Sequence, residues 1–435
     1  MHRWWMDFGG SFETIFRRSR WWLLAAILGH ISLAIGYLTA MPAFNWPDEP
    51  AHLNYILSIA NGRGLPEMAA DSWAPESLDR LKSRHFEGVD PSDPEIAQMT
   101  YEAHQPPLFY VLAALLLRLT GSVTVVRFFN LLLSCTVVAI TPAIVRSLWP
   151  EDRWLAPAAA GLLALHPMRC FMAVSVGNDP AAELAGAVLL LVLARRGHPM
   201  WVGVVTGVGL LIKAVFLLAI PLYAGWIWIV KDKPPRLRPW VVASATALLI
   251  AAPWIIRNVV IYGGADAMAI STGALGFDEL RPRLAPTGEA SLLPFLWLSF
   301  QSWWGTFGWM EMLPDLRALS VYLALSIGAG VGLVKRLVDR NLPDSLRQDC
   351  DRFLVWLIGA HLLLLAALVV YGRFDFQAQG RYLLMLSPGS AILCAVGLAT
   401  ALGRWFPLGS LVSALALLWV NLLNIRHVIP WYLGR

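Results

Sequence analysis

Long apolar runs recur along the whole chain, and they constrain its fold more than any other feature. A helix needs roughly 20 apolar residues to cross the hydrocarbon core of a bilayer. Runs that approach this length are found at 21–42, 127–148, 154–173, 238–256, 353–371 and 382–402. With 57% hydrophobic and 14% charged residues, the chain has too few charges to solvate a water-soluble globule of 435 residues. We therefore expect an all-α polytopic membrane protein.

The distribution of charged and reactive side chains excludes several other classes of protein. The net charge is +5, but the basic residues form short clusters between apolar runs, so nucleic acid is not an expected partner. The four cysteines lie singly in or beside apolar runs, which argues against a zinc or disulfide module. The sequence has neither a Walker-type loop nor a dinucleotide-binding fingerprint.

The positions of Lys and Arg predict how the chain is threaded, because these residues favour cytoplasmic loops. Four arginines within the first 20 residues place the N-terminus inside, so the acidic segment 43–104 follows on the outer side. The run 107–119 is short for a span, and we expect it to be an amphipathic helix in the outer interface. The spans that then keep the basic clusters inside are 21–42, 127–148, 154–173, 180–195, 200–213, 214–230, 238–256, 317–335, 353–371, 382–402 and 407–425.

This threading gives about eleven spans, with the N-terminus inside and the C-terminus outside. We expect a cytoplasmic N-terminus over 1–20, one transmembrane domain over 21–425 and a short outer tail over 426–435. The domain carries large outer loops at 43–126 and 257–316. Five polar motifs reach the same outer boundary, which indicates a functional site because ionisable groups near hydrocarbon are costly without a partner or a task.

The motif WPDEPAH, residues 46–52, follows the first span directly. Its two adjacent carboxylates stand between prolines in a stiff turn, where partial desolvation raises carboxylate basicity. Asp48 and Glu49 are therefore candidate catalytic residues that could deprotonate a hydroxyl, and His52 is a candidate substrate-binding residue. The structural alternative is that Asp48 caps the helix beginning near Pro50, with Glu49 in its first turn.

Two further motifs bring hydrogen-bonding groups to the same boundary. His104 and Gln105 precede the interfacial helix, where His104 could position a phosphate or a substrate hydroxyl, or only bond to loop carbonyls. Asn178 and Asp179 could cap the helix 180–195 and also reach a sugar hydroxyl or a cation. Asp48 and Asp179 together could form a weak divalent site for Mg²⁺ or Mn²⁺, although the sequence offers no evident third ligand.

A cationic group completes the set of candidate residues. Lys213 stands between two short apolar runs, Arg257 closes a span, and Arg381 opens another within Gln379-Gly380-Arg381-Tyr382. A lysine at an outward turn cannot easily reach the inner face, so it needs an anionic partner. A lipid phosphate would suit all three cations, whereas ordinary pairing with protein carboxylates or lipid headgroups is the alternative.

In this order the motifs resemble those of the GT-C superfamily of membrane glycosyltransferases. The superfamily includes protein mannosyltransferases, lipid A aminoarabinose transferases and the catalytic subunit of oligosaccharyltransferase. The resemblance covers most of the chain and is closest to bacterial protein-mannosyltransferase-like and aminoarabinose-transferase-like enzymes. Besides the candidate residues above, it rests on Arg127 at the start of a span, on PWIIRNVVIYG at 253–263 and on WGTFGW at 304–309.

The resemblance implies an inverting transfer of a sugar from a polyprenyl-phosphate carrier to an acceptor hydroxyl outside the bacterial cytoplasmic membrane. Asp48 matches the general base of the family, and Glu49 would orient the acceptor or tune its neighbour Asp48. Lys213, Arg257 and Arg381 would bind the phosphate and stabilise the charge of the leaving group. The acceptor would be a lipid, a glycan or a protein. Because the chain ends about ten residues after its last predicted span, acceptor recognition is expected from the loops 43–104 and 257–316.

Two other functions stay open from the sequence. A transporter or flippase for a lipid-linked glycan would need gated access from both faces and a site near the bilayer midplane, a pattern that only Lys213 with its short flanking helices fits. A glycan polymerase or ligase of another fold would share the lipid-linked substrate without needing the carboxylates of the first loop.

Overall fold

The computed structural model describes residues 20–69, 72, 75–90, 93–230, 237–269, 292–338, 344–372 and 378–433. Within these ranges the chain is helical and has no strand, apart from an isolated antiparallel bridge between Phe307 and Met312. The all-α class predicted from the apolar runs is confirmed. The N-terminal residues 1–19 lie outside the described residues, as do Lys231, Lys233 and Arg236 of the predicted basic cluster before Arg238.

Six apolar helical stretches have the length and hydropathy to cross a membrane, as expected of a multi-pass membrane protein. Five of them lie in single helices, namely α2 (Arg20–Ala40), α7 (Val123–Leu148), α13 (Leu237–Tyr262), α17 (Leu316–Val338) and α18 (Asp344–Tyr371). The sixth contains α19 (Ser387–Leu402) and α20 (Phe406–Leu433), which are joined by the short turn η5 (Gly403–Trp405). The predicted count of about eleven spans is not confirmed, because the other apolar helices of the described chain are shorter.

The shorter elements divide into apolar helices and helices of the polar loops. The apolar ones are α6 (Leu108–Thr120), α8 (Leu155–Ala164), α9 (Pro167–Met172), α10 (Asp179–Ala194), α11 (Pro199–Leu210), α12 (Ala219–Val230) and α16 (Leu292–Gly305). The polar loops form α3 (Glu49–Ala60), α4 (Pro75–Ser83), α5 (Pro94–Ala97), η1 (Tyr101–His104) and η3 (Gly264–Asp266). The large outer loop expected at 257–316 is therefore partly helical, because α13 extends into it and α16 lies within it.

Three predicted spans are interrupted, and a proline lies in the first turn of the α-helix that follows each interruption. The span 154–173 breaks between α8 and α9, where His166 is extended and Pro167 begins the next helix. The spans 214–230 and 382–402 start as the 3₁₀ helices η2 (Ala214–Leu218) and η4 (Gly380–Leu386). Pro221 and Pro388 lie within the first three residues of the α-helices that follow. Proline fits the first turn of an α-helix, but the helix cannot continue back through it without losing hydrogen bonds.

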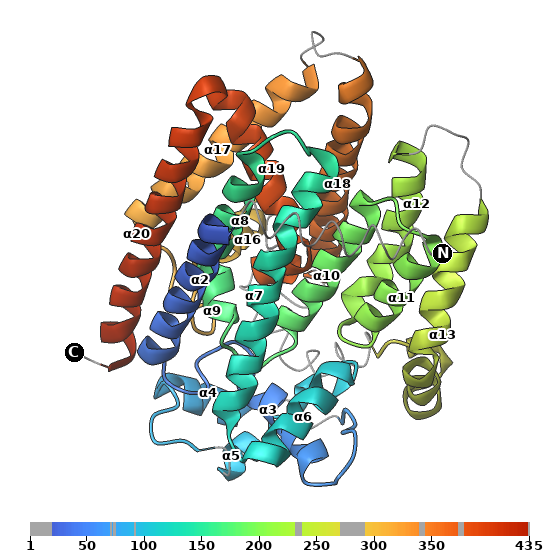
Figure 1. The fold of residues 1–435 in the computed structure, drawn as a ribbon. Coiled ribbons are helices and arrows are strands. Elements are labelled where there is room, and N and C mark those ends of the chain that lie inside the picture. Colours follow the sequence, from blue (N-terminus) through green and yellow to red (C-terminus); the bar gives the residue numbers. More distant parts are fainter. Residues whose placement is uncertain are drawn as a thin grey trace.

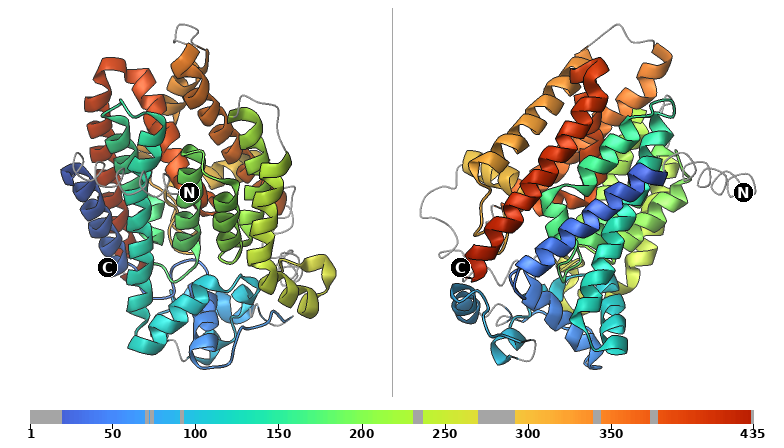
Figure 2. Two further views of the ribbon diagram at one scale, coloured as in Figure 1. Left: turned by 45° about the vertical axis from the view of Figure 1, so that its right-hand side comes forward. Right: turned by 60° about the vertical axis from the view of Figure 1, so that its left-hand side comes forward.

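The polar elements gather at one end of the long helices. Figures 1 and 2 show α3, α4, α5 and α6 at this end, where α20 also finishes. The turn between α19 and α20 lies at the opposite end (Figure 1). α6 has the length predicted for the interfacial helix and packs against α3 and α7. α20 continues to Leu433, so the segment predicted as a tail is helical over 426–433.

A close approach between α10 and η4 fixes the two segments that later form the site. Gly186 on α10 lies so near η4 that a Cβ atom there would overlap the carbonyl group of Met385. Beside it, the buried ion pair between Arg169 and Glu183 joins α9 to α10, and the Ser387 hydroxyl donates a hydrogen bond to the same Glu183 carboxylate. These contacts hold the N-terminal end of α10 against η4.

Candidate active site

Asp48 lies in the turn between α2 and α3 and has a left-handed backbone with a φ of 60°. Its carbonyl oxygen accepts a hydrogen bond from the His52 N–H at 3.0 Å, but its side chain makes no capping bond. The carboxylate instead accepts a hydrogen bond from the Tyr101 hydroxyl at 3.2 Å and forms an ion pair with Arg381. The side-chain capping interpretation is therefore wrong. A non-glycine residue held in this conformation is a form of strain that functional sites often keep.

Glu49, the neighbouring carboxylate, is 1% exposed and is held inside the protein. Its Oε1 atom lies 2.6 Å from Nη2 of Arg127 on α7. It also accepts hydrogen bonds from the backbone N–H groups of Phe44 at 2.8 Å and Val176 at 3.3 Å. Glu49 is not among the residues that line the cavity described below. These contacts tie Glu49 to the turn of Asp48, and the catalytic role of Glu49 stays a prediction.

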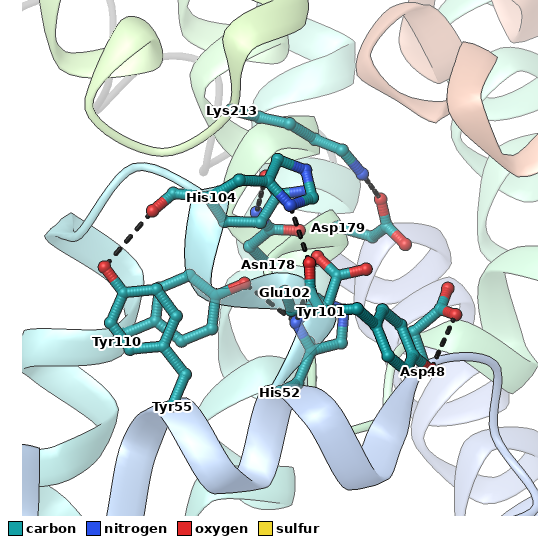
Figure 3. Close-up of polar contacts among 12 residues, drawn as sticks. Asp48, His52, Tyr55, Tyr101, Glu102, His104, Tyr110, Asn178, Asp179 and Lys213 are labelled. Atoms are coloured by element: carbon teal, nitrogen blue, oxygen red, sulfur yellow. Dashed lines mark hydrogen bonds and ion pairs between the residues drawn. The ribbon is translucent and has the colours of Figure 1, made fainter. Parts of the chain in front are cut away.

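An alternating chain of charges connects four segments at the polar end. Lys213, between α11 and η2, pairs with Asp179 at the start of α10. Asp179 also lies 3.5 Å from Nη1 of Arg381 on η4, and the same guanidinium pairs with Asp48. The ring of Tyr382 lies beside both cations, with its centroid 5.3 Å from Lys213 Nζ and 5.2 Å from the guanidinium carbon of Arg381. Figure 3 shows Lys213 reaching towards Asp179, with Asp48 beside Tyr101.

The charge chain determines the protonation state of Asp48. Burial has the largest single effect and would raise the pKa of the Asp48 carboxyl group. The charge and hydrogen bond of Arg381, together with smaller contributions from His52 and Lys82, outweigh burial and hold the pKa below its ordinary value of 3.8. Asp48 is therefore an ionised carboxylate at neutral pH, which is the form that accepts a proton.

The 3₁₀ helix η1 places two more polar side chains next to Asp48. Tyr101 is buried and donates its hydroxyl hydrogen bond to Asp48. Glu102 is 8% exposed, and its Oε2 atom has no hydrogen-bond partner among the described residues. Burial raises the pKa of the Glu102 carboxyl group above its ordinary value of 4.5. The two carboxyl groups of the site are thus in opposite electrostatic environments.

His104, Gln105 and Asn178 form a connected hydrogen-bond network beside η1. Nδ1 of His104 lies 2.8 Å from the carbonyl oxygen of Tyr101, which can only accept, so Nδ1 carries the proton and Nε2 accepts from the Gln105 amide at 3.2 Å. Burial lowers the pKa of His104, in agreement with a neutral ring. The Asn178 amide donates to Oε1 of Gln105 at 3.1 Å and to the carbonyl of Ile212 at 3.0 Å. Asn178 therefore ties three loops together, and its side chain does not cap α10.

A cavity of about 340 Å³ opens beside these residues and has two chemically different walls. Its polar wall is formed by Asp48, Tyr101, Glu102, His104, Gln105, Lys213 and Tyr382. Its apolar wall comes from η2 and from one side of α18, and includes Leu217, Leu218, Leu364, Ala367 and Leu368. The cavity can therefore hold a ligand with a polar, anionic head and an apolar chain.

Several predicted site residues lie outside this cavity. Arg257 donates to the carbonyl oxygen of Pro66 at 2.7 Å and to Asn258 at 3.1 Å, so it holds the first loop to α13 and is not one of the cavity cations. His52 is buried, with Nδ1 2.8 Å from the Tyr110 hydroxyl. Gln379 accepts a hydrogen bond from Nε of Arg381 at 2.5 Å and so orients that guanidinium.

The residues present do not fit a divalent metal. The described chain contains no group of three His, Cys, Asp or Glu side chains arranged to hold a metal ion. Asp48 and Asp179, the two ligands predicted for a weak Mg²⁺ or Mn²⁺ site, both contact the guanidinium of Arg381, which occupies the space between them. The two carboxylates therefore have Arg381 as their partner in place of a metal ion.

Two polar residues of the cavity were missed by the sequence reasoning. Tyr101 and Glu102 stand directly before the His104 motif, so their place in the chain was a usable signal, but nothing in the sequence showed that their side chains face Asp48. The apolar wall from α18 carried no signal at all, because its leucines look like those of any spanning helix.

Comparison with known proteins adds evidence on the fold. No protein-family model matches the chain, and no curated protein matches it by sequence. It is similar to the apo crystal structure of the oligosaccharyltransferase from Archaeoglobus fulgidus, with 13% identity and a TM-score of 0.50 over 95% of this chain and 57% of that chain. The oligosaccharyltransferase AglB of the same organism, in complex with an inhibitory peptide and a dolichol-phosphate, matches with 14% identity and a TM-score of 0.49 over 95% of this chain and 56% of that chain.

The chain thus spans little more than half the length of these oligosaccharyltransferases. At 13% identity the likeness is one of fold. It agrees with the resemblance found in the motifs, and together they show that this multi-pass membrane protein has a GT-C-type helical fold.

Proposed function

We propose that the chain is a membrane glycosyltransferase that moves a sugar from a polyprenyl-phosphate donor to an acceptor hydroxyl, with inversion and with Asp48 as the general base. The observation that carries this proposal is the position of Asp48. Its ionised carboxylate borders a cavity that offers a lysine for a phosphate and an apolar wall for a lipid chain. The fold, shared with an oligosaccharyltransferase, supports the same class of reaction.

The arrangement accounts for the chemistry that such a transfer needs. The acceptor hydroxyl gives its proton to Asp48 while its oxygen attacks the anomeric carbon of the sugar. The bond from that carbon to the phosphate oxygen breaks, and the phosphate keeps the electron pair. Lys213 lines the cavity and Arg381 stands directly behind Asp48, so both can stabilise the charge that grows on the leaving phosphate. Direct attack from the side opposite the phosphate inverts the anomeric centre.

We place the reaction on the outer side of the cytoplasmic membrane of a bacterium. The support is the distribution of charges, because the polar loops with the site gather at one end of the bundle while Arg195 and Arg196 follow α10 at its far end from the site. A lipid, a glycan or a protein hydroxyl would serve as the acceptor. The transport and polymerase alternatives have less support, because the site's polar groups belong to one end of the molecule and include an ionised carboxylate poised as a base.

The function is tested by the variant Asp48→Asn in protein reconstituted with radiolabelled undecaprenyl-phosphate sugars and a membrane extract that supplies acceptors. The swap keeps the size of the side chain but removes the proton acceptor, so transfer should fall by about 100- to 10,000-fold. Asp152→Asn is the matched control, because Asp152 caps α8 with hydrogen bonds from Trp154 and Leu155 at 2.8 and 3.0 Å, far from the cavity. Transfer by Asp48→Asn within a few-fold of the parent rate would refute the base assignment.

A further inference from the structure

Two carboxyl groups face the same cavity, and their surroundings differ sharply. Asp48 has a guanidinium and a hydroxyl as partners. Glu102 lines the cavity from η1, is 8% exposed, and leaves its Oε2 atom without a hydrogen bond among the described residues. Figure 3 shows Glu102 between His52 and the pair formed by Asp179 and Lys213. A buried carboxyl oxygen without a partner is expensive, so this group requires an explanation.

No cation of the described site neutralises Glu102. The basic side chain that comes within 4.0 Å of this carboxyl group is His52, whose Nδ1 atom is 4.0 Å from Oε2, beyond hydrogen-bond distance. That nitrogen lies 2.8 Å from the Tyr110 hydroxyl, and burial lowers the pKa of His52, so the ring is neutral. Lys213 is paired with Asp179, and Arg381 is paired with Asp48 and Asp179.

The electrostatics agree with a protonated Glu102. Burial raises the pKa of the Glu102 carboxyl group, the Asp48 carboxylate raises it further, and the attraction of the basic side chains around it is too small to cancel this rise. When two carboxyl groups share a site and their pKa values move apart, one acts as the proton acceptor and the other as the proton-bearing group.

We propose that Glu102 is a neutral carboxylic acid that donates a hydrogen bond to a phosphate oxygen of the lipid-linked donor. This assignment deepens the proposed function and rests on it. A phosphate bound at Lys213 would be repelled by a carboxylate in the same cavity, whereas a carboxylic acid can approach it and donate. Glu102 keeps its proton throughout the transfer: the acceptor proton goes to Asp48, and the hydrogen bond from Glu102 strengthens as the leaving phosphate gains charge.

The test compares Glu102→Gln with Glu102→Ala in purified protein in nanodiscs, with binding of undecaprenyl phosphate as the readout. Glutamine keeps a neutral N–H donor, so we expect its affinity to stay within about threefold of the parent protein. Alanine removes the donor, and the affinity should fall about ten- to a hundredfold. Thermal unfolding of each variant identifies any loss that comes from misfolding.

A pH series separates this role from a structural one. The neutral acid is present below its raised pKa and is lost as the pH rises through it, so the parent protein should lose affinity at alkaline pH relative to Glu102→Gln. The phosphate itself titrates equally in both proteins, and the ratio of the two affinities cancels that effect. Glu102→Gln binding as weakly as Glu102→Ala, or Glu102→Ala binding as tightly as the parent, would overturn the proposal.

The binding readout also distinguishes this proposal from the proposed function. Undecaprenyl phosphate carries no sugar, so its binding does not depend on transfer. The expected pattern at Glu102 without any sugar transfer by the parent protein would leave a lipid-phosphate site and refute the glycosyltransferase. Sugar transfer that depends on Asp48, combined with tight binding by Glu102→Ala, would keep the enzyme and remove Glu102 from its phosphate site.

Discussion

Adjacent residues of the first loop have different tasks because the backbone turns between them. The left-handed conformation of Asp48 sends its carboxylate towards η1 and η4, whereas Glu49 begins α3 and meets Arg127 on α7. One residue therefore borders the cavity, and the next secures the turn that presents it. Removing Glu49 would leave the buried Arg127 without its carboxylate, which is costly in itself.

The cations of the site allow a paired test of phosphate binding. Lys213 lines the cavity, whereas Arg257 is bonded to the carbonyl of Pro66 outside it. Lys213→Met keeps most of the side-chain volume but removes one charge-assisted contact, so undecaprenyl phosphate should bind about ten- to a hundredfold more weakly. Arg257→Met should change this affinity by less than about threefold. Equilibrium binding in nanodiscs measures both.

The reverse ranking would show that the phosphate lies at the mouth of the first loop instead of in the cavity. Equal and large losses would point to a general effect of net charge at this end of the molecule, and repeating the titration at higher salt would expose such an effect because salt screens exposed charges.

At the residue scale, the sequence could predict which groups share one end of the molecule but not their directions. Lys213, Arg381 and Asp48 were all expected at one boundary, and they lie within one chain of ion pairs. Arg257 lies outside the cavity lining, and the sequence could not show this, because the positive-inside pattern gives the end of a helix and not the direction of a side chain. The hydrogen bond from Arg257 to Pro66 joins α13 to a loop residue 191 positions earlier, and no local sequence pattern marks it.

At the scale of elements, the site depends on helices that stop short. Lys213 stands directly before η2, and Arg381 lies in η4. Both side chains therefore contact Asp179 at the start of α10. The prolines that follow η2 and η4 are present in the sequence, but the apolar runs around them were long enough to suggest continuous spans. Hydropathy averages over a run and therefore hides a break that one proline imposes.

The contact between α10 and η4 is testable by adding one methyl group. Gly186→Ala would place a Cβ atom against the carbonyl of Met385, a backbone atom that cannot rotate away. We expect a loss of about 1–3 kcal/mol in the free energy of unfolding, seen as a lower midpoint of thermal unfolding in detergent. Transfer activity should fall as well, because Asp179 belongs to α10 and Arg381 belongs to η4.

Gly359→Ala is the control for helix propensity, because Gly359 is an exposed glycine of α18 with no neighbouring atom within 4 Å of the added Cβ. Alanine in a helix is about 1 kcal/mol better than glycine, so this variant should unfold at the same temperature or higher. A stabilised Gly186→Ala would mean that α10 and η4 can separate freely, and the positioning argument for Asp179 and Arg381 would fail.

At the scale of the whole molecule, the polar loops and the site gather at one end of the helices. The first loop with its helices, the start of α10 and the start of η4 meet at this end (Figure 1). The turns after α7, after α10 and between α19 and α20 each contain at least one arginine. Composition alone predicted a membrane protein of this class, because no soluble fold could cover so much apolar surface. The number of spans could not be predicted, since the short helices that build the site resemble spans in sequence.

The orientation of the two ends can be measured with an impermeant maleimide on single cysteines placed in a variant that lacks the four native ones. Glu87 is exposed at the end that carries the site, whereas Glu151 and Arg404 are exposed in the turns after α7 and α19. Because Lys and Arg favour the cytoplasmic side, Glu87→Cys should react in intact bacterial cells, and Glu151→Cys and Arg404→Cys only after permeabilisation. The loop positions 234 and 270 lie outside the described residues, and we expect them inside and outside, respectively. Labelling of Glu151→Cys in intact cells would invert the threading, and with it the donor, because sugars linked to a lipid carrier would then be taken from the cytoplasmic leaflet.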